Sequence, residues 1–191
     1  MVTVNVIKTM PMTSIASQAA ALAKKRVLVG VPAETSTRPN TGEKINNAEL
    51  LYILSHGVRK KAMRDEMQAN IDSGMKYSAA HSLYIQEHGS PLWQIPPRPV
   101  LEPAIEDKKA PIAKQLREAA KAAIDGNMQG AENRLHMAGM VAENAAKGWF
   151  EDPKNGWPPN SPKTIARKGS DSPMIDTGEM RKSITHVIRE E

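Results

Sequence analysis

The segment SLYIQEHGSPLWQIPPRPVLEPAI, residues 82–105, decides the predicted fold because it joins three kinds of structure. It begins like the last turn of a helix, continues as a proline-rich strap, and ends in the start of a second helix. Pro96, Pro97 and Pro99 fix their own φ angles and push the residues before them toward extended backbone. The strap is therefore predicted to be a rigid spacer. Arg98, held between prolines, should direct its guanidinium toward a carboxylate or a group of carbonyl oxygens.

The opening of this segment, LYIQEHG at 83–89, has a near copy upstream, LYILSHG at 51–57. In both copies a histidine precedes a glycine that can end a helix. A histidine at this position can donate a hydrogen bond to the last helix carbonyls, or its positive charge can balance their partial negative charge. The Tyr-Ile pair is predicted to lie on the buried side of the helix. A histidine acting as a general base would need a partner and a pocket, and the sequence indicates neither. We therefore interpret both histidines as parts of helix ends.

Alternation and helical spacing predict an α+β fold with a small mixed or antiparallel sheet packed with several helices. In this sheet a C-terminal strand pairs with one of two N-terminal strands. The predicted strands are 2–7, 27–31 and the alternating end at 184–188, and the predicted helices are 13–25, 46–57, 103–126 (broken at Pro111) and 131–150.

A chain of 191 residues is long enough for one ordinary domain, and we predict a single domain over 1–191. Two stretches rich in Pro, Gly, Ser and Asn, 32–43 and 151–175, are predicted to be extended loops. Ser161 can cap one short helix inside the second loop. Residues 58–80 are polar and compatible with helix, and we predict that they form an inserted helical arm.

The net charge of +5 lies entirely in residues 1–76, which hold eleven Lys or Arg and six Asp or Glu. Residues 77–191 hold fifteen of each. The cluster that contains Arg59, Lys60 and Lys61 could meet nucleic acid or an acidic partner, although a solvated helix face is the more common explanation. The chain has no cysteine, which excludes disulfides and thiolate sites, and no apolar run long enough to span a bilayer.

No catalytic, cofactor-binding or metal-binding site is predicted. Histidine pairs at metal-ligand spacing, phosphate-binding loops and nucleophile elbows are missing from the sequence. The triplet Asp176-Thr177-Gly178 superficially matches an aspartic protease motif, but that enzyme needs two such aspartates. Trp93 and Trp157 could be recognition hot spots or could equally anchor loops onto the core. We expect the chain not to be an enzyme.

Three motifs occur in order along the chain: an aromatic-Ile-x-x-His-Gly phrase from Tyr84 to Gly89, an Ile-Pro-x-Arg-Pro strap from Ile95 to Pro99, and Thr177-Gly178 followed by Ser183-Ile184. With them the chain resembles the tail-completion or neck proteins of long-tailed bacteriophages, including those of Mu-like phages. The resemblance covers residues 82–191, and the N-terminal strand–helix–strand fits the family fold more loosely. Residues 51–81 look like an insertion relative to shorter relatives.

The resemblance implies a virion structural protein, assembled in the bacterial host cytoplasm, with no membrane partner. Its subunits would form a ring, usually sixfold, at the head–tail junction. The ring would join the head connector or stopper to the tail tube or tail terminator, and phage DNA would pass through it without sequence-specific binding. A tail terminator that caps the tube, and a basic nucleic-acid-binding module, are the alternatives. The predicted interface residues are Trp93, Pro97, Arg98, Trp157, Thr177, Gly178, Arg59, Lys60 and Lys61.

Within this picture the second copy of the phrase, followed by the strap, is predicted to set the fold. The first copy is predicted to start the added arm, 58–80, whose basic face would meet a neighbouring subunit or DNA.

Overall fold

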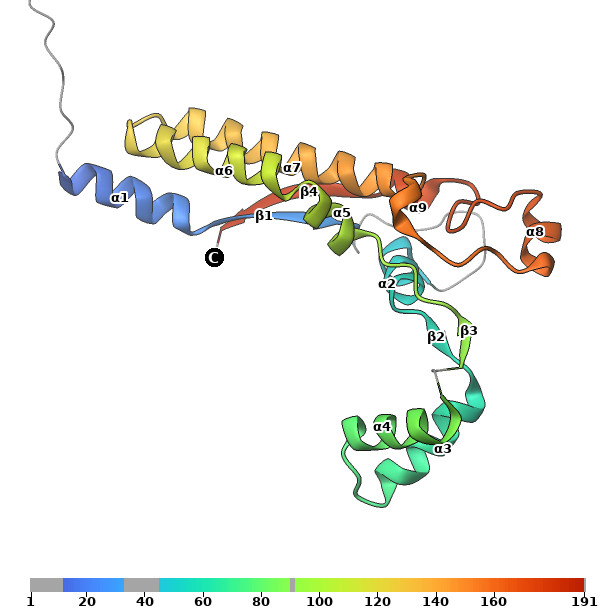
Figure 1. The fold of residues 1–191 in the computed structure, drawn as a ribbon. Helices are drawn as coiled ribbons and strands as arrows, with labels where there is room; N and C mark the ends of the chain where they lie inside the picture. Colours follow the sequence, from blue (N-terminus) through green and yellow to red (C-terminus); the bar gives the residue numbers. More distant parts are fainter. Residues whose placement is uncertain (1–11, 33–44, 90–91, 191) are drawn as a thin grey trace, which may run out of the picture. The chain divides into compact units, whose positions relative to one another are not determined.

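The computed structural model of the chain describes residues 12–32, 45–89 and 92–190 (Figure 1). Helices and short antiparallel strand pairs make up these residues, which confirms the predicted α+β class. The predicted strand at 2–7 and nearly all of the predicted loop at 32–43 lie outside the described residues. The chain divides into two compact units, one within 1–32, 101–149 and 182–191, the other within 33–100 and 150–181. Each unit is described by itself, and the single domain over 1–191 stays a prediction.

The first unit, called unit 1, is built on a helical hairpin and a two-stranded ribbon. Helices α6 and α7 lie side by side, and the β1–β4 ribbon packs along α7 (Figure 1). The pairing of β1 with β4 is antiparallel and runs from Lys25 opposite Glu190 to Gly30 opposite Thr185, which confirms the predicted C-terminal pairing. The elements of unit 1 are α1 (Met12–Ala23), β1 (Lys25–Gly30), α5 (Leu101–Asp107), α6 (Lys109–Ile124), α7 (Met128–Trp149) and β4 (Thr185–Glu190).

Alanine dominates the buried positions of α6 and α7. Because a methyl group is small, the two helix backbones can approach closely, and a few larger side chains such as Leu135 and Ile184 complete the core. The helix break falls at Lys108, not at Pro111, since proline is tolerated in the first turn of α6. The buried alanines are Ala119, Ala123, Ala131, Ala138, Ala142 and Ala146.

Gly139 in the middle of α7 makes room for the ring of His186 on β4. A Cβ atom at this position would lie 2.6 Å from the His186 Cγ. That distance is far inside van der Waals contact and involves the stem of the ring rather than a flexible tip. The ribbon therefore rests directly on the helix backbone at this point.

Gly139→Ala should lower the free energy of unfolding by about 2 kcal/mol, because the clash outweighs the better helix propensity of alanine. Gly148→Ala is the matched control, because it lies in the same helix and its added methyl would meet no atom of the described residues within 4 Å. It should be neutral or stabilise by roughly 0.5–1 kcal/mol. Urea unfolding of both variants measures the difference, and equal midpoints would contradict the packing described.

The second unit, called unit 2, contains the strap and both copies of the repeated phrase. Strands β2 and β3 pair antiparallel, with Val58 opposite Ile95 and Arg59 opposite Trp93. Helices α3 and α4 form a hairpin beyond this ribbon (Figure 1). The elements of unit 2 are α2 (Asn47–His56), β2 (Val58–Arg59), α3 (Lys61–Asp72), α4 (Tyr77–His88), β3 (Trp93–Ile95), the 3-10 helix η1 (Pro153–Asn155), α8 (Pro162–Lys168) and α9 (Glu179–Lys182), whose last residue falls in unit 1.

The arm predicted at 58–80 is helical only from Lys61 onward, since its first two residues form β2, and its second helix extends beyond residue 80. Met63 and Met67 of α3 pack with Tyr84 of α4 in one buried cluster, and Ile85 packs against it. The second copy of the phrase, 83–89, therefore belongs to the α3–α4 hairpin. Deleting 58–80 would strip Tyr84 of its partners, so those residues do not form a separable insertion in the way the sequence suggested.

The strap contacts the first copy of the phrase. The Arg98 N–H donates to Leu54 O at 2.9 Å, and a Cβ on Gly57 would lie 2.7 Å from Ile95 O and 2.8 Å from Pro97 N. Gly57 has φ +74°, which favours glycine. The first copy is thus packed on the strap, although the sequence assigned it only the start of the arm.

The two copies also differ in burial. Tyr84 is 3% exposed, as predicted for the Tyr-Ile pair, whereas Tyr52 is 65% exposed, so that prediction is wrong for the first copy. His56 Nδ1 lies 2.9 Å from Tyr52 O and satisfies a helix carbonyl as predicted. His88 Nε2 instead lies 2.9 and 3.1 Å from the Glu66 carboxylate oxygens.

The predicted loop at 151–175 contains two short helices. Ser161 caps α8 as predicted, since its Oγ accepts from Thr164 N at 3.3 Å. Asp152 caps η1 by accepting from Lys154 N at 2.9 Å. These caps hold the segment in a defined course across unit 2.

Candidate functional site

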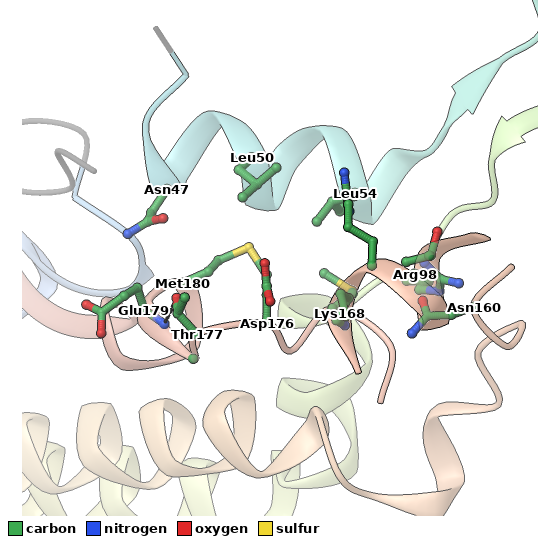
Figure 2. Close-up of a pocket in the computed structure, with 14 residues that line it drawn as sticks. Asn47, Leu50, Leu54, Arg98, Asn160, Lys168, Asp176, Thr177, Glu179 and Met180 are labelled. Atoms are coloured by element: carbon green, nitrogen blue, oxygen red, sulfur yellow. Dashed lines mark hydrogen bonds between the residues drawn. The ribbon is translucent and has the colours of Figure 1, made fainter. Parts of the chain in front are cut away.

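A cavity of about 500 Å³ lies within unit 2, between α2, the strap and the segment that ends in α9 (Figure 2). We call it the Arg98 cavity. Helix α2 supplies Asn47, Leu50 and Leu54 along one side. The other lining residues are Arg98, Asn160, Thr164, Arg167, Lys168, Met174, Asp176, Thr177, Gly178, Glu179 and Met180.

Arg98 closes one end of the cavity and fastens the strap to the second proline-rich segment. Its Nε and Nη2 donate to Pro158 O at 3.1 and 2.8 Å, and Nη2 also donates to Pro159 O at 3.0 Å. Of the two partners predicted for Arg98, a carboxylate or a group of carbonyl oxygens, the structure provides the carbonyl oxygens. The side chain is buried, and burial lowers the pKa of Arg98 from its usual value, although a guanidinium remains charged.

Trp157 makes a second link between the same two segments. Its Nε1 donates to Pro99 O at 3.1 Å, and its ring meets that of Phe150 edge to face with centroids 5.9 Å apart. Of the two interpretations that the sequence allowed for Trp157, the structure provides the contacts of a loop anchor. Together, Arg98 and Trp157 hold residues 157–159 against the strap.

Positive charge collects at the Arg98 end. Burial lowers the pKa of Lys168, the nearby cations Arg98 and Arg167 lower it further, and Asp176 opposes them. The Lys168 ammonium donates to Ser172 O at 2.8 Å. Sequence analysis did not single out Arg167 or Lys168, because basic residues in the last turn of a helix are ordinary partners of the helix dipole.

Asn47 lies at the other end of the cavity, across from Thr177 and Glu179 in Figure 2. Asparagine is a favoured N-cap residue. Of the adjacent Asn46 and Asn47, Asn46 caps α2, because its Oδ1 accepts from Glu49 N at 2.9 Å. Asn47 is only 5% exposed, and its Oδ1 has no hydrogen-bond partner in the part of the chain that is described. An unpaired buried acceptor costs about 1–3 kcal/mol, so its presence requires a reason.

The predicted site residues therefore fall into two groups. Arg98, Thr177 and Gly178 line the cavity, while Pro97 and Trp157 lie in the segments that build its wall. Arg59 and Trp93 pair across the β2–β3 ribbon, away from the cavity lining.

The Arg59 guanidinium is engaged by aromatic groups. It lies 5.9 Å from the Trp93 ring centroid and 5.6 Å from that of Tyr77, and it donates a hydrogen bond to the Tyr77 hydroxyl. Lys60 and Lys61, which follow it, are exposed. Arg59 therefore stabilises the base of the arm, and the two lysines supply the accessible charge there.

Unit 1 carries a separate polar network on α7 and β4. His186 Nδ1 lies 2.7 Å from Glu143 Oε2, Lys147 Nζ lies 2.6 Å from Glu143 Oε1, and His136 Nδ1 lies 3.4 Å from His186 Nε2. Burial raises the pKa of Glu143, but the hydrogen bonds from Lys147 and His186 outweigh it, and the pKa is lowered overall. The network links the strand ribbon to the helix that supports it.

Because the folded pKa of Glu143 lies below its unfolded value of 4.5, ionised Glu143 stabilises the fold above that pH. The contribution should be lost as the pH falls from 4.5 through the folded pKa. Thermal unfolding at pH 6 and pH 3 should therefore show a larger loss for the native chain than for Glu143→Gln. Equal losses would show that Glu143 carries no such linkage.

One possible set of metal ligands occurs among the described residues. Glu66, Glu87 and His88 place one ligand atom each within 4.8 Å of one another. These side chains are substantially exposed, and His88 already pairs with Glu66, so the structure gives no reason to assign a metal there.

Comparison with protein-family models, with curated proteins and with solved structures finds no match. Among the residues that the structure describes, no helix combines the length and the hydropathy needed to cross a membrane.

Proposed function

We propose that this chain is a structural subunit of a ring at the head–tail junction of a long-tailed bacteriophage. In this proposal the ring joins the head connector to the tail tube, and DNA passes through its centre. The chain acts through its contacts with neighbouring subunits and needs no catalytic group. A tail terminator that caps the tube belongs to the same class of function and remains the alternative within it.

The observation that carries the proposal is that two of the three family-like motifs meet in one place. Arg98 of the strap and Thr177-Gly178 of the C-terminal motif are far apart in the sequence, yet they line the same cavity. The strap is held rigidly by the Arg98 and Trp157 hydrogen bonds. A rigid, externally accessible framework of this kind suits a subunit that must present fixed surfaces to its neighbours.

Ring formation by the purified full-length chain tests the proposal. Negative-stain electron microscopy should show closed rings with a central channel at micromolar or higher concentration. Monomers at every concentration examined would contradict a self-assembling ring.

A nucleic-acid-binding module is the second candidate, and one feature of α3 favours it. Lys60 precedes α3 as its N-cap, Lys61 and Arg64 lie in the first turn of the helix, and that turn has no acidic residue. Cations at a helix N-terminus oppose the helix dipole, and an external anion would relieve this repulsion. The candidate predicts DNA binding that weakens steeply with salt and is reduced in Lys60→Glu/Lys61→Glu. Absence of binding at low salt would remove it.

A further inference from the structure

We propose that the cationic end of the Arg98 cavity binds the phosphate group of a small phosphate monoester whose apolar body lies along α2. The site goes beyond the proposed function, because a structural ring subunit needs no small-molecule ligand. It uses the Arg98 end of the cavity alone. Asn47 Oδ1, at the other end, is covered by neighbouring atoms and takes no part.

Arg98 supplies the first hydrogen-bond donor of the site. Its Nε and Nη2 donate to the carbonyls of Pro158 and Pro159, whereas Nη1 has no partner among the described residues. Arg98 is only 7% exposed, yet Nη1 is not one of the unpartnered atoms that are shielded from solvent. The carbonyl contacts therefore hold the guanidinium in place while one of its nitrogens stays open to an external acceptor.

Arg167 and Lys168 add two further positive charges at the same end. None of the three cations forms an ion pair within the described part of the chain. Burial lowers the pKa of Lys168, Asp176 raises it, and Arg98 and Arg167 lower it further, so the three positive charges act on one another. A bound anion would relieve this repulsion.

The acidic residues of the lining do not neutralise this end. Figure 2 shows Lys168 between Asp176 and Arg98, and Asp176 makes no ion pair with Lys168 among the described residues. Glu179, the other acidic lining residue, lies toward the Asn47 end (Figure 2). One carboxylate near three cations leaves an excess of positive charge at the Arg98 end.

The free donors suit a phosphate better than a carboxylate. Paired recognition of a carboxylate uses two parallel N–H groups of one guanidinium, and in Arg98 the Nε and Nη2 groups are already engaged. The donors that remain belong to three separate side chains, Arg98, Arg167 and Lys168. A phosphate monoester offers three terminal oxygens to such a set, whereas a carboxylate offers two.

The remainder of the cavity provides space for an apolar body. Its volume of about 500 Å³ lies within the roughly 300–1,000 Å³ typical of small-molecule sites. Leu50 and Leu54 line the α2 side, and Met174 and Met180 line it from the segment that ends in α9. Methionine side chains adapt readily to the shape of an apolar group. Inorganic phosphate cannot use these contacts, but a short alkyl chain attached to the phosphate can.

Isothermal titration calorimetry with hexyl phosphate and the full-length chain tests the chemistry of the site. Hexyl phosphate should bind at least roughly tenfold more tightly than inorganic phosphate, which lacks the apolar body, and than hexanoate, which has a carboxylate head. Hexyltrimethylammonium, with the same chain and a positive head, should not bind.

Three results of this titration would overturn the proposal. If hexyl phosphate does not bind, the site is absent. Hexanoate that binds as tightly as hexyl phosphate would overturn the assignment of a phosphate. Hexyltrimethylammonium that binds as tightly would show that the apolar wall binds alone, without the cations.

A matched pair of variants on α8 locates the site. Lys168→Gln removes a charge from the cavity but keeps an N–H donor for Ser172 O, and Lys163→Gln makes the same change at an exposed position outside the lining. Lys168→Gln should weaken hexyl phosphate binding at least roughly tenfold, while Lys163→Gln should bind like the native chain. Equal affinities of the two variants would overturn the cavity as the site.

Arg167→Gln provides a second variant in case Lys168→Gln disturbs the fold, because Arg167 is exposed. It should melt at the native temperature without hexyl phosphate and show a smaller rise in melting temperature than the native chain when hexyl phosphate is added. An equal rise in Arg167→Gln and the native chain would contradict the contribution of Arg167. These outcomes are independent of ring formation, which electron microscopy of the purified chain tests separately.

Discussion

Gly57→Ala should destabilise unit 2 by about 4 kcal/mol, one of the two largest effects expected from a single substitution in this chain. A positive φ costs an L-residue roughly 1–2 kcal/mol, and forcing a methyl group against fixed atoms adds roughly 1–3 kcal/mol. The added methyl would meet Ile95 O and Pro97 N, which are backbone atoms of a strap that cannot move aside easily. Urea unfolding followed by tryptophan fluorescence should show a midpoint about 2 M lower.

Gly89→Ala is the matched control because Gly89 ends the other copy of the same phrase. Its φ is also positive, at +82°, but within the described part of the chain no atom lies within 4 Å of the added methyl. The substitution should cost only the backbone term of about 1–2 kcal/mol. If the two variants lost the same stability, the strap would not lie against the first copy.

Arg98→Ala should cost about 4 kcal/mol, since it removes a buried cation from two carbonyl groups. Hydrogen bonds to a charged group are worth roughly 1.5–3 kcal/mol each, and the acceptors left behind lose their partners. Because the same guanidinium holds Pro158 and Pro159, its loss should also release the segment that Trp157 anchors. Thermal unfolding and the near-ultraviolet circular dichroism of the tryptophans measure both effects.

Arg98→Lys separates geometry from charge. An ammonium cannot place Nε and Nη2 donors on two carbonyls at once, so lysine should recover only part of the loss. Arg167→Ala, an exposed cation lining the same cavity, should change stability by less than roughly 0.5 kcal/mol. If Arg98→Ala kept the stability of the native chain, Arg98 would not hold the Pro158 and Pro159 carbonyls as described.

Local structural features, such as a helix cap or the hydrogen-bond partners of a side chain, were predictable from the sequence where the residue type and its neighbours determine them. The cap at Ser161, the C-terminal pairing of 184–188 and the carbonyl partners of Arg98 follow from side-chain type, alternation and proline neighbours. The start of the helix predicted at 46–57 lies within one residue of the start of α2 at Asn47.

Long-range packing was not predictable in the same way. Tyr52 and Tyr84 stand in nearly identical phrases, but only Tyr84 meets the two methionines of α3, so identical local sequence gives opposite burial. The β2–β3 pairing joins two very short strands whose alternation is too brief to detect. The grouping of Arg98 with Lys168 and the unpaired Oδ1 of Asn47 arise only when distant segments close the cavity.

The most direct test of the proposed function is electron microscopy of phage particles assembled without this protein. The account predicts DNA-filled heads separated from free tails, or tails of uncontrolled length, with infectivity restored when the full-length chain is supplied. Normal, infectious particles in its absence would contradict a role at the head–tail junction.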